Sequence, residues 1–596
     1  MTIRFSYFKV LKFLLVSLFF LSSKIQALSY TARVGEPSFE SPKNIRSFFN
    51  KSDRDIKTDC IIKVNDQYSF DKIQESLEEA LKAGYKNIEV VFIRGKYTFH
   101  NEHIKIVNFS DNVSIRFKGR GCILIPDGRL KNYKGKKEVL NYCFFHSDNE
   151  FNEVNVWTPF YPTDSLIQVV NVQEKICRLH VPSVYLKDLE ISDNSMIQYT
   201  EWYYSRICKV ERIDKDYIYF KVPELFSIGE YYNVNYDYRW HKVMPRFRVS
   251  QVRYEKEVYE GTAGIFCCFK ESSFNSVSFE GLTVIGNCSQ NDLFCLDNCK
   301  FEDYFLLFNC SFSSQRGSVI SVKRSNNIYI QNCQFRNQYS TVIYSDRNTK
   351  HTEVTRNSFD NCGLGMQNDF CVVCSGSDYL VSRNRIKDFG YGAIAAGIWY
   401  KFDQTIPSNG YIECNEIFCS KSYLNNVEQH GLIDGGAIYL WTKNDDVVIR
   451  YNYIGNISGA GSNRGIYCDD GAYGFTIYGN VISNVINSNY IDSRIDQSDF
   501  LTTNTNNIVM YNIIEGRYKF EGSLKPNNGC IKGKNIVLKQ KGAAPFHIVV
   551  NNIESQQEDT YLEYKSNRDL GIIVPQSTRK ELRKLPFYRL IRKYLK

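Results

Sequence analysis

The C-terminal half of the chain repeats short runs in which apolar and polar positions alternate, as in IYIQNCQF and FTIYGNVI. Alternation with a period of two indicates β-strands that bury one face. Each copy also contains an asparagine with a large apolar residue one to three positions later. These asparagines are 23, 25, 27, 31, 37, 28, 32 and 40 residues apart: Asn309, Asn332, Asn357, Asn384, Asn415, Asn452, Asn480, Asn512 and Asn552. A repeat of this length with one short strand per copy predicts a solenoid.

A parallel β-helix explains the asparagines directly. Equivalent turns of successive coils stack about 4.8 Å apart, and side-chain amides at that spacing can hydrogen-bond along a ladder. Crossover connections between parallel strands favour the right hand. We therefore expect a right-handed parallel β-helix with the asparagines stacked at one turn, where they serve as scaffold.

The N-terminal part departs from this repeat in two places. The string FDKIQESLEEALKAG is an amphipathic helix pattern that ends before Gly84, and strand-like strings follow it. Its apolar face comprises Phe70, Ile73, Leu77, Ala80 and Leu81. This order of elements resembles that of known β-helix proteins, in which a short helix caps the first coil and covers its exposed strand edges. The repeat is then lost over residues 129–250, where alternating strings such as KDYIYFKV predict an inserted β-rich domain.

The resulting fold class is all-β: a right-handed parallel β-helix solenoid with an N-terminal capping helix and an inserted β-rich domain. We expect a signal peptide at 1–27, a linker at 28–58, the cap and first coils at 59–128, the insertion at 129–250, the main β-helix at 251–560 and a basic tail at 561–596.

The two ends of the chain suggest where the protein works. The apolar run FLLVSLFFL after a basic start resembles a secretory signal, although an uncleaved anchor is the alternative. We therefore expect export to the periplasm, the cell surface or the medium. The basic C-terminal tail could lie on an anionic membrane or form a solvated helix. Lys and Arg exceed Asp and Glu by 74 to 65. The chain lacks a nucleic-acid-binding motif, and we expect a monomer.

The 19 cysteines favour free buried thiols over a disulfide framework. Their number is odd, and many lie in apolar strands or beside repeat asparagines, where a cysteine acts as a small hydrophobe. The pair CVVC at residues 371–374 has no partner pair at zinc-binding spacing. We therefore expect neither a metal site nor a cofactor.

Candidate chemistry lies where the repeat is broken. The spacing grows to 31 and 37 residues around Asn415 and Asn452, and the surplus residues predict loops. These loops flank HGLIDGGAIYLW and NRGIYCDDGAYG, which align through their shared Ile-Tyr. Ile438 should then stack on Ile466, and Tyr439 on Tyr467, in adjacent coils. If the isoleucines face inward, alternation predicts an exposed outer patch of Tyr439, Trp441, Tyr467 and Asp469.

Three aspartates surround this patch, namely Asp434, Asp469 and Asp470. Crowded carboxylates raise one another's pKa, which suits acid and base chemistry. Asp-Gly is also common turn chemistry, so either Asp434 or Asp470 alone could be a turn residue. Arg464 could bind a substrate carboxylate or pair with an aspartate. His430 could contribute to the site or be structural.

The coils, the asparagine ladder and the strings DGGAIY and GIYCDDGAYGFTIYGNVI resemble the right-handed parallel β-helix, or pectin-lyase-like, superfamily. More narrowly, residues 60–130 and 260–555 are similar to bacterial secreted β-helix glycoside hydrolases. The resemblance implies that Asp434 and Asp469 or Asp470 cleave a glycosidic bond. From the strings themselves we expect the substrate-binding residues to be Tyr439, Trp441, Tyr467, Arg464 and His430. The strings depart from the pattern in having no glutamate.

Three functions follow as alternatives. The first is a secreted glycoside hydrolase that uses the paired aspartates on a polysaccharide or oligosaccharide. The second is a lyase of uronic-acid polymers, in which Arg464 neutralises the substrate carboxylate and His430 or a lysine abstracts the proton. The third is a non-catalytic glycan-binding or assembly protein at the cell surface.

Overall fold

The structure is a computed structural model. It describes residues 43–48, 57–65, 69–99, 104–126, 167–171, 174, 176–180, 196–201, 204–215, 217–221, 248–252, 266–285, 292–313, 315, 317–338, 340–363, 369–397, 406–407, 409–420, 435–441, 443–455, 457–459, 464–469, 472–483, 486–487, 490–491, 495–497, 507–510, 512–515, 531–533, 536–540, 560–564 and 583. The expected signal peptide lies outside the described residues, as does the basic tail except for residues 561–564 and Arg583.

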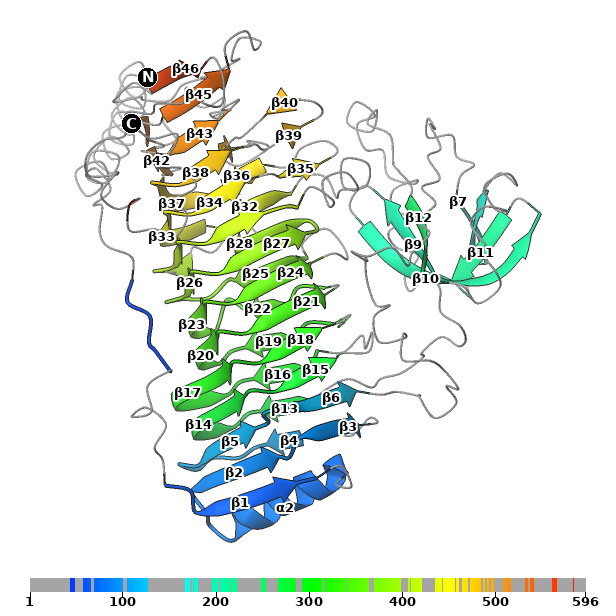
Figure 1. Cartoon of the computed structure of the whole chain (residues 1–596), viewed down its shortest axis with the longest axis vertical. Helices are drawn as coiled ribbons and strands as arrows, with labels where there is room; N and C mark the ends of the chain where they lie inside the picture. Colours follow the sequence, from blue (N-terminus) through cyan, green and yellow to red (C-terminus); the bar gives the residue numbers. More distant parts are fainter. Residues whose placement is uncertain are drawn as a thin grey trace, which may run out of the picture.

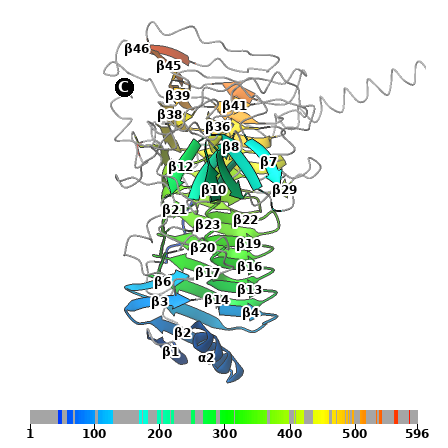
Figure 2. The ribbon, with the colours of Figure 1, turned by 90° about the vertical axis from the view of Figure 1, so that its right-hand side faces the viewer.

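Three long parallel sheets stack the coils of a solenoid (Figures 1 and 2). In spatial order, sheet A contains β1 (Cys60–Val64), β2 (Asn87–Phe92), β5 (Ser114–Lys118), β14 (Ser273–Glu280), β17 (Lys300–Phe308), β20 (Asn326–Gln331), β23 (Lys350–Thr355), β26 (Leu380–Ser382), β30 (Tyr411–Glu413), β33 (Lys443–Arg450), β37 (Tyr473–Tyr478), β42 (Ile508–Met510) and β44 (Ile531–Gly533), with β29 (Ile406–Pro407) beside β33.

Sheet B contains β3 (Gly95–Phe99), β6 (Cys122–Pro126), β15 (Thr283–Ile285), β18 (Ser311–Ser313), β21 (Gln334–Gln338), β24 (Ser358–Cys362), β27 (Arg385–Phe389), β31 (Glu416–Phe418), β34 (Tyr453–Gly455), β38 (Val481–Ser483), β43 (Ile513–Glu515), β45 (Ile536–Gln540) and β46 (Thr560–Tyr564). Sheet C contains β4 (Ile104–Val107), β13 (Cys267–Lys270), β16 (Phe294–Asp297), β19 (Ile320–Lys323), β22 (Ile343–Ser345), β25 (Phe370–Cys374), β28 (Gly392–Ala396), β32 (Gly436–Leu440), β36 (Arg464–Cys468) and β41 (Ile495–Gln497).

Each coil passes from sheet C to sheet A and then to sheet B, as β13, β14 and β15 do. Every strand pairs in parallel with its equivalent in the next coil, so that identical side-chain positions form columns. The columns that face inward are apolar and form one continuous core along the solenoid. The expected right-handed parallel β-helix is therefore confirmed, and the twofold alternation follows from strands that bury only their inner face.

In the sequence, an antiparallel sheet is inserted between the first coils and the rest of the solenoid. It contains β12 (Arg248–Val252), β9 (Met196–Glu201), β10 (Tyr204–Asp214), β11 (Tyr217–Lys221), β8 (Ile176–His180) and β7 (Ile167–Asn171). The solenoid resumes in register after it, because β4, β5 and β6 pair with β13, β14 and β15. A small sheet of β35 (Ser458–Gly459), β39 (Ile486–Asn487) and β40 (Tyr490–Ile491) lies farther along the chain.

The helix α2 (Phe70–Lys82) covers the first coil, as expected. The residues of the helix that are buried are Phe70, Ile73, Leu77 and Ala80. Gln74 also satisfies the edge strand β4, because its side-chain amide donates to the Lys105 carbonyl at 2.8 Å and its oxygen accepts from the Lys105 N–H at 2.9 Å. A side chain thus replaces the missing neighbouring strand at the edge of sheet C.

The asparagines lie at the turn between sheets A and B. The main-chain N–H and the side-chain amide of Asn357 both donate to Oδ1 of Asn384, at 3.0 and 3.1 Å. The same pattern continues through Asn415, Asn452, Asn480 and Asn512, all of them buried. The ladder is confirmed for these copies, whereas Asn552 lies outside the described residues.

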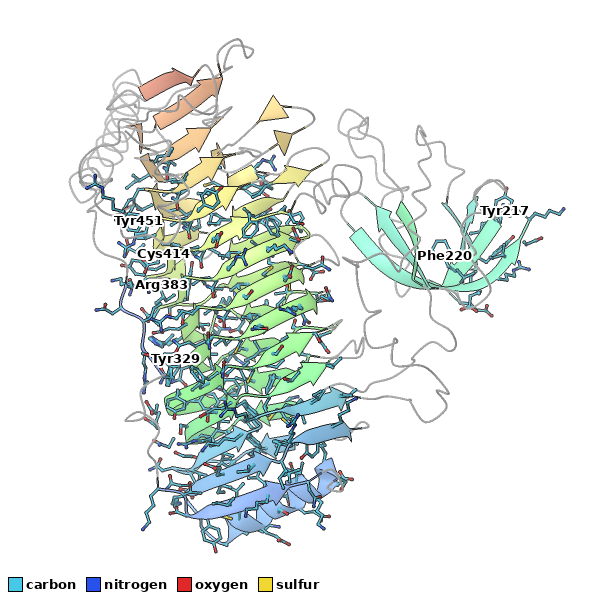
Figure 3. All side chains as sticks on the ribbon, viewed as in Figure 1. Tyr217, Phe220, Tyr329, Arg383, Cys414 and Tyr451 are labelled. Atoms are coloured by element: carbon cyan, nitrogen blue, oxygen red, sulfur yellow. The ribbon has the colours of Figure 1, made fainter. Side chains whose placement is uncertain are left out.

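The first two copies need a correction of one residue. Asn309 and Asn332 do not occupy the inner ladder position, which belongs in their coils to Cys310 and Cys333: the Cys333 N–H donates to Oδ1 of Asn357 at 2.8 Å. Both asparagines instead adopt φ near +55°, as Arg383, Cys414 and Tyr451 do in later coils (Figure 3). Asparagine tolerates this left-handed conformation, which explains why a similar string supports two different positions.

The 14 cysteines whose side chains the structure describes are free thiols, and all of these except Cys60 and Cys295 are buried. Cys310 and Cys333 point their thiols at main-chain carbonyls of the turn. The prediction of free buried cysteines is confirmed for this part of the chain. Over the same residues, no helix has both the length and the apolar character needed to cross a membrane.

Candidate functional site

The two strings singled out in the sequence form neighbouring strands of sheet C. β32 pairs with β36, and the register places Ile438 against Ile466 and Tyr439 against Tyr467. Both isoleucines belong to the inner core of the solenoid. The alignment through Ile-Tyr is therefore confirmed.

The tyrosines belong to a second cluster on the outer face of sheet C. It consists of Phe370, Val373, Tyr391, Ala395, Tyr439 and Tyr467, with Tyr344 and Trp441 packed against it. We name this the outer aromatic cluster. The alternation argument predicted the correct face, but the expectation of an exposed patch was wrong for Tyr439 and Tyr467, which are 1% and 2% exposed. Their rings pack edge to face at a centroid distance of 5.1 Å, so each ring covers part of the other.

Asp469 follows β36 and lies in this cluster. Its main-chain N–H donates to the Leu440 carbonyl at 2.9 Å, and its own carbonyl accepts from the Ala472 N–H. The Tyr467 hydroxyl donates to Oδ1 at 2.8 Å, and the Tyr439 hydroxyl donates to Oδ2. The side chain is 8% exposed rather than open to solvent. Two phenols from adjacent coils thus orient one carboxylate.

The two tyrosines that hold Asp469 differ in their surroundings: a cation lies on the ring of Tyr467, and burial raises the pKa of Tyr439. The Arg464 guanidinium lies over the Tyr467 ring, 3.6 Å from its centroid, in cation–π contact. Burial above all, and then the nearby Tyr391 and Asp469, raise the pKa of the Tyr439 phenol well above its ordinary value. Tyr439 therefore stays protonated and can remain a donor at neutral pH.

Glycines make room for these rings. A Cβ on Gly436 would lie 2.9 Å from Cβ of Tyr467, and one on Gly435 would lie 2.0 Å from the Tyr391 carbonyl oxygen. The Gly-Gly pair of the first string is required by this close approach, in agreement with the tight backbone path expected there.

Two further members of the cluster, Phe370 and Tyr391, were not expected. They come from β25 and from the residue before β28, and Tyr439 contacts both at centroid distances of 5.6 Å. The register Phe370–Gly392–Gly436–Arg464 places a large ring beside two glycines in adjacent coils. This alternation of large and small residues across repeats is a pattern that could have indicated them.

Not all predicted site residues can be placed. His430, Asp434 and Asp470 lie outside the described residues. Trp441 is partly buried at the edge of the cluster, with its ring 5.8 Å from that of Tyr439. The structure therefore brings together Asp469, Tyr439, Tyr467, Arg464 and Trp441. Within the described ranges, no three His, Cys, Asp or Glu residues gather as metal ligands would.

Both oxygens of Asp469 accept hydrogen bonds from phenols, so the group is held as an acceptor. Such a group is suited to accept a proton, to attack a carbon or to stabilise a cation. It is poorly arranged to donate a proton, because its acceptor positions are already occupied by donors. Any general acid of this site must then be another residue.

No protein-family model matches the sequence, and no curated protein matches it. Among solved structures, the chain is similar to a glycoside hydrolase, with 10% identity and a TM-score of 0.44, over 72% of this chain and 94% of that one. It is also similar to XylC in complex with xylose, with 10% identity, a TM-score of 0.30 and coverage of 86% and 87%. A third structure is the tailspike of the Acinetobacter baumannii bacteriophage AP22 with a capsular saccharide, with 11% identity, a TM-score of 0.22 and coverage of 85% and 75%. These similarities concern the coiled architecture and do not assign a function.

Proposed function

We propose that the protein is an exported carbohydrate-active enzyme, a glycoside hydrolase whose catalytic centre includes Asp469. The observation that carries the proposal is the position of the Asp469 carboxylate. It lies on the outer face of sheet C and is held by two tyrosine hydroxyls from adjacent coils. The resemblance of the repeat strings to secreted β-helix glycosidases supports the same class.

The roles follow from the hydrogen bonds. Asp469 acts as the nucleophile, or as the base toward water, because its oxygens are held as acceptors. Asp434 or Asp470 supplies the proton to the leaving oxygen. Trp441, at the edge of the cluster, offers a flat face to a sugar ring, and Arg464 contributes positive charge near the carboxylate.

A screen of the purified protein against a panel of polysaccharides tests this function. Product masses distinguish addition of water, formation of a double bond and the absence of turnover. Asp469→Asn should abolish hydrolysis while the protein remains folded. Hydrolysis that persists in this variant would place the reaction elsewhere.

Asp388→Asn is a matched control. Asp388 is also a buried aspartate, but its oxygens accept from the N–H and hydroxyl of Ser420, at 2.5 and 2.9 Å, beside sheet B. Loss of activity in both variants would indicate a general structural defect. Loss in Asp469→Asn alone supports a chemical role.

The second candidate is a polysaccharide lyase, for which Arg464 is the specific observation. A guanidinium beside the site could neutralise a uronic-acid carboxylate. Products that absorb in the near ultraviolet would support the lyase and exclude hydrolysis as the main reaction. Saturable glycan binding without either product would support the non-catalytic alternative.

A further inference from the structure

A short segment near the N-terminus lies along the outer face of sheet A, in contact with residues that come much later in the sequence. Residues 43–48, with the sequence KNIRSF, appear in blue beside the solenoid in Figure 1. We name this segment the strap. Its described contacts reach from Asp303 in β17 to Glu413 in β30. Three strands of sheet A, namely β20, β23 and β26, separate these two.

The strap backbone is held by a side chain rather than by a neighbouring strand. The Gln331 side-chain amide donates to the Arg46 carbonyl at 2.9 Å, and its oxygen accepts from the Phe48 N–H at 3.2 Å. One amide thus satisfies the two main-chain groups on either side of Ser47. This contact requires an extended peptide but no particular side chain.

Side-chain selectivity comes from two neighbouring pockets. Phe48 is fully buried among Tyr304, Leu306, Phe308 and Tyr329. Arg46 forms an ion pair with Asp303 at 2.7 Å. Its guanidinium carbon also lies 4.9 to 5.4 Å from the centroids of Phe48, Tyr304 and Tyr329, the last labelled in Figure 3. The pockets therefore select a cation followed two residues later by an aromatic ring.

The far end of the strap completes a buried ion pair. Glu413 and Arg450 are buried and joined at 2.7 Å, and Arg450 also donates to the Tyr478 hydroxyl. Oε2 of Glu413 accepts a hydrogen bond from Nε of Arg450, whereas Oε1 accepts one from the main-chain N–H of Lys43 at 2.6 Å. The Lys43 ammonium lies over the Tyr411 ring at 4.3 Å. At this end the strap thus donates a main-chain N–H to Glu413 and places its ammonium on a tyrosine ring, whereas a strap cation meets a carboxylate at Arg46–Asp303.

We propose that the outer face of sheet A between β17 and β30 is a peptide-recognition groove. It is specific for an extended segment of the form Arg-x-Phe, and the strap is its resident ligand. Coils of a solenoid contact only their nearest neighbours. A ligand that binds β17, β20 and β30 together couples the coils of β17 and β30, which three intervening strands separate. The groove is separate from the outer aromatic cluster, which lies on sheet C.

The test uses the full chain with a weakened strap, Arg46→Ala/Phe48→Ala, and a fluorescein-labelled peptide of residues 41–50. Fluorescence anisotropy should show saturable binding. A control peptide in which alanine replaces the same two residues should bind at least about tenfold more weakly, because it lacks the ion pair and the ring. Circular dichroism checks that the protein variant is folded.

A groove variant makes the assignment specific. Asp303 is partly exposed, so Asp303→Asn should fold, and it removes only the charge that faces Arg46. When Asp303→Asn is combined with the weakened strap, the native peptide should bind more weakly. Binding of a peptide that carries only Arg46→Ala should not change. Absence of saturable binding, or equal binding of the native and control peptides, would overturn the proposal.

Discussion

Two regions of the solenoid bury polar side chains in opposite ways. In the asparagine ladder, each amide is satisfied by the same residue in the next coil, so that Asn357, Asn384 and Asn415 have equivalent surroundings. In the outer aromatic cluster, the carboxylate of Asp469 occurs once, and its partners are tyrosines. A polar group repeated in every coil stabilises the coils. A polar group without a counterpart in its neighbours cannot join such a ladder, and the role that we propose for Asp469 is catalytic.

The largest expected effect is on catalysis by Asp469. Asp469→Asn retains the size of the side chain but removes the negative charge, and its amide nitrogen can donate to the phenol oxygen that donated to the carboxylate. Turnover of a substrate that the parent cleaves should fall by about 10²–10⁴-fold or more. Steady-state kinetics measure this, and the unfolding midpoint should remain close to that of the parent. Full activity would reduce Asp469 to a structural turn residue.

The ladder should show the reverse behaviour. Asn357→Ala leaves the Cys333 N–H and the Ile330 carbonyl without their side-chain partner in a buried turn. The free energy of unfolding should drop by about 2–4 kcal/mol, since each buried unsatisfied group costs about 1–3 kcal/mol. Urea denaturation measures the loss, while activity per folded molecule should be unchanged.

Asn332→Gly is the control for the ladder. This residue has φ +56° outside the inner position, a conformation that glycine adopts freely. The variant should be nearly as stable as the parent. A loss equal to that of Asn357→Ala would contradict the one-residue correction.

A smaller effect is expected from pH. The folded pKa of Tyr439 is raised, first by burial, so its contribution to stability is complete below the unfolded tyrosine pKa of about 10. That contribution is lost as the pH rises above this value. Urea midpoints between pH 8 and 11 should fall less steeply for Tyr439→Phe than for the parent. Identical slopes would show that the phenol does not resist ionisation.

The smallest expected effect concerns the buried cysteines, both in the asparagine ladder and in sheet C. Burial raises the pKa of Cys333 well above its ordinary value, and that of Cys374 to about 12. Thiol reagents at pH 8 should therefore react slowly with the native protein and rapidly after denaturation. Rapid modification of the native protein would show that the coil interior opens.

The repeat could be predicted because it is a local property written many times. The twofold alternation and the spacing of the asparagines identified the strands, the turn and the stacking of Tyr439 on Tyr467. One-residue errors arose where NCSF and NCQF resembled NSF, because asparagine suits both the ladder and a left-handed turn residue. Neighbouring coils, rather than the string itself, distinguish the two.

The sequence by itself determined the coil, its capping helix and the face on which each strand residue lies, since alternation and amphipathicity depend on neighbours along the chain. The tertiary structure alone decided the burial of Tyr439 and Tyr467, which depends on Phe370 and Tyr391 from other coils. It also decided the place of the strap, whose partners Asp303 and Glu413 are 257 and 370 residues away in sequence. Contacts at such separations leave no periodic trace, because they form once and only after the coils have stacked.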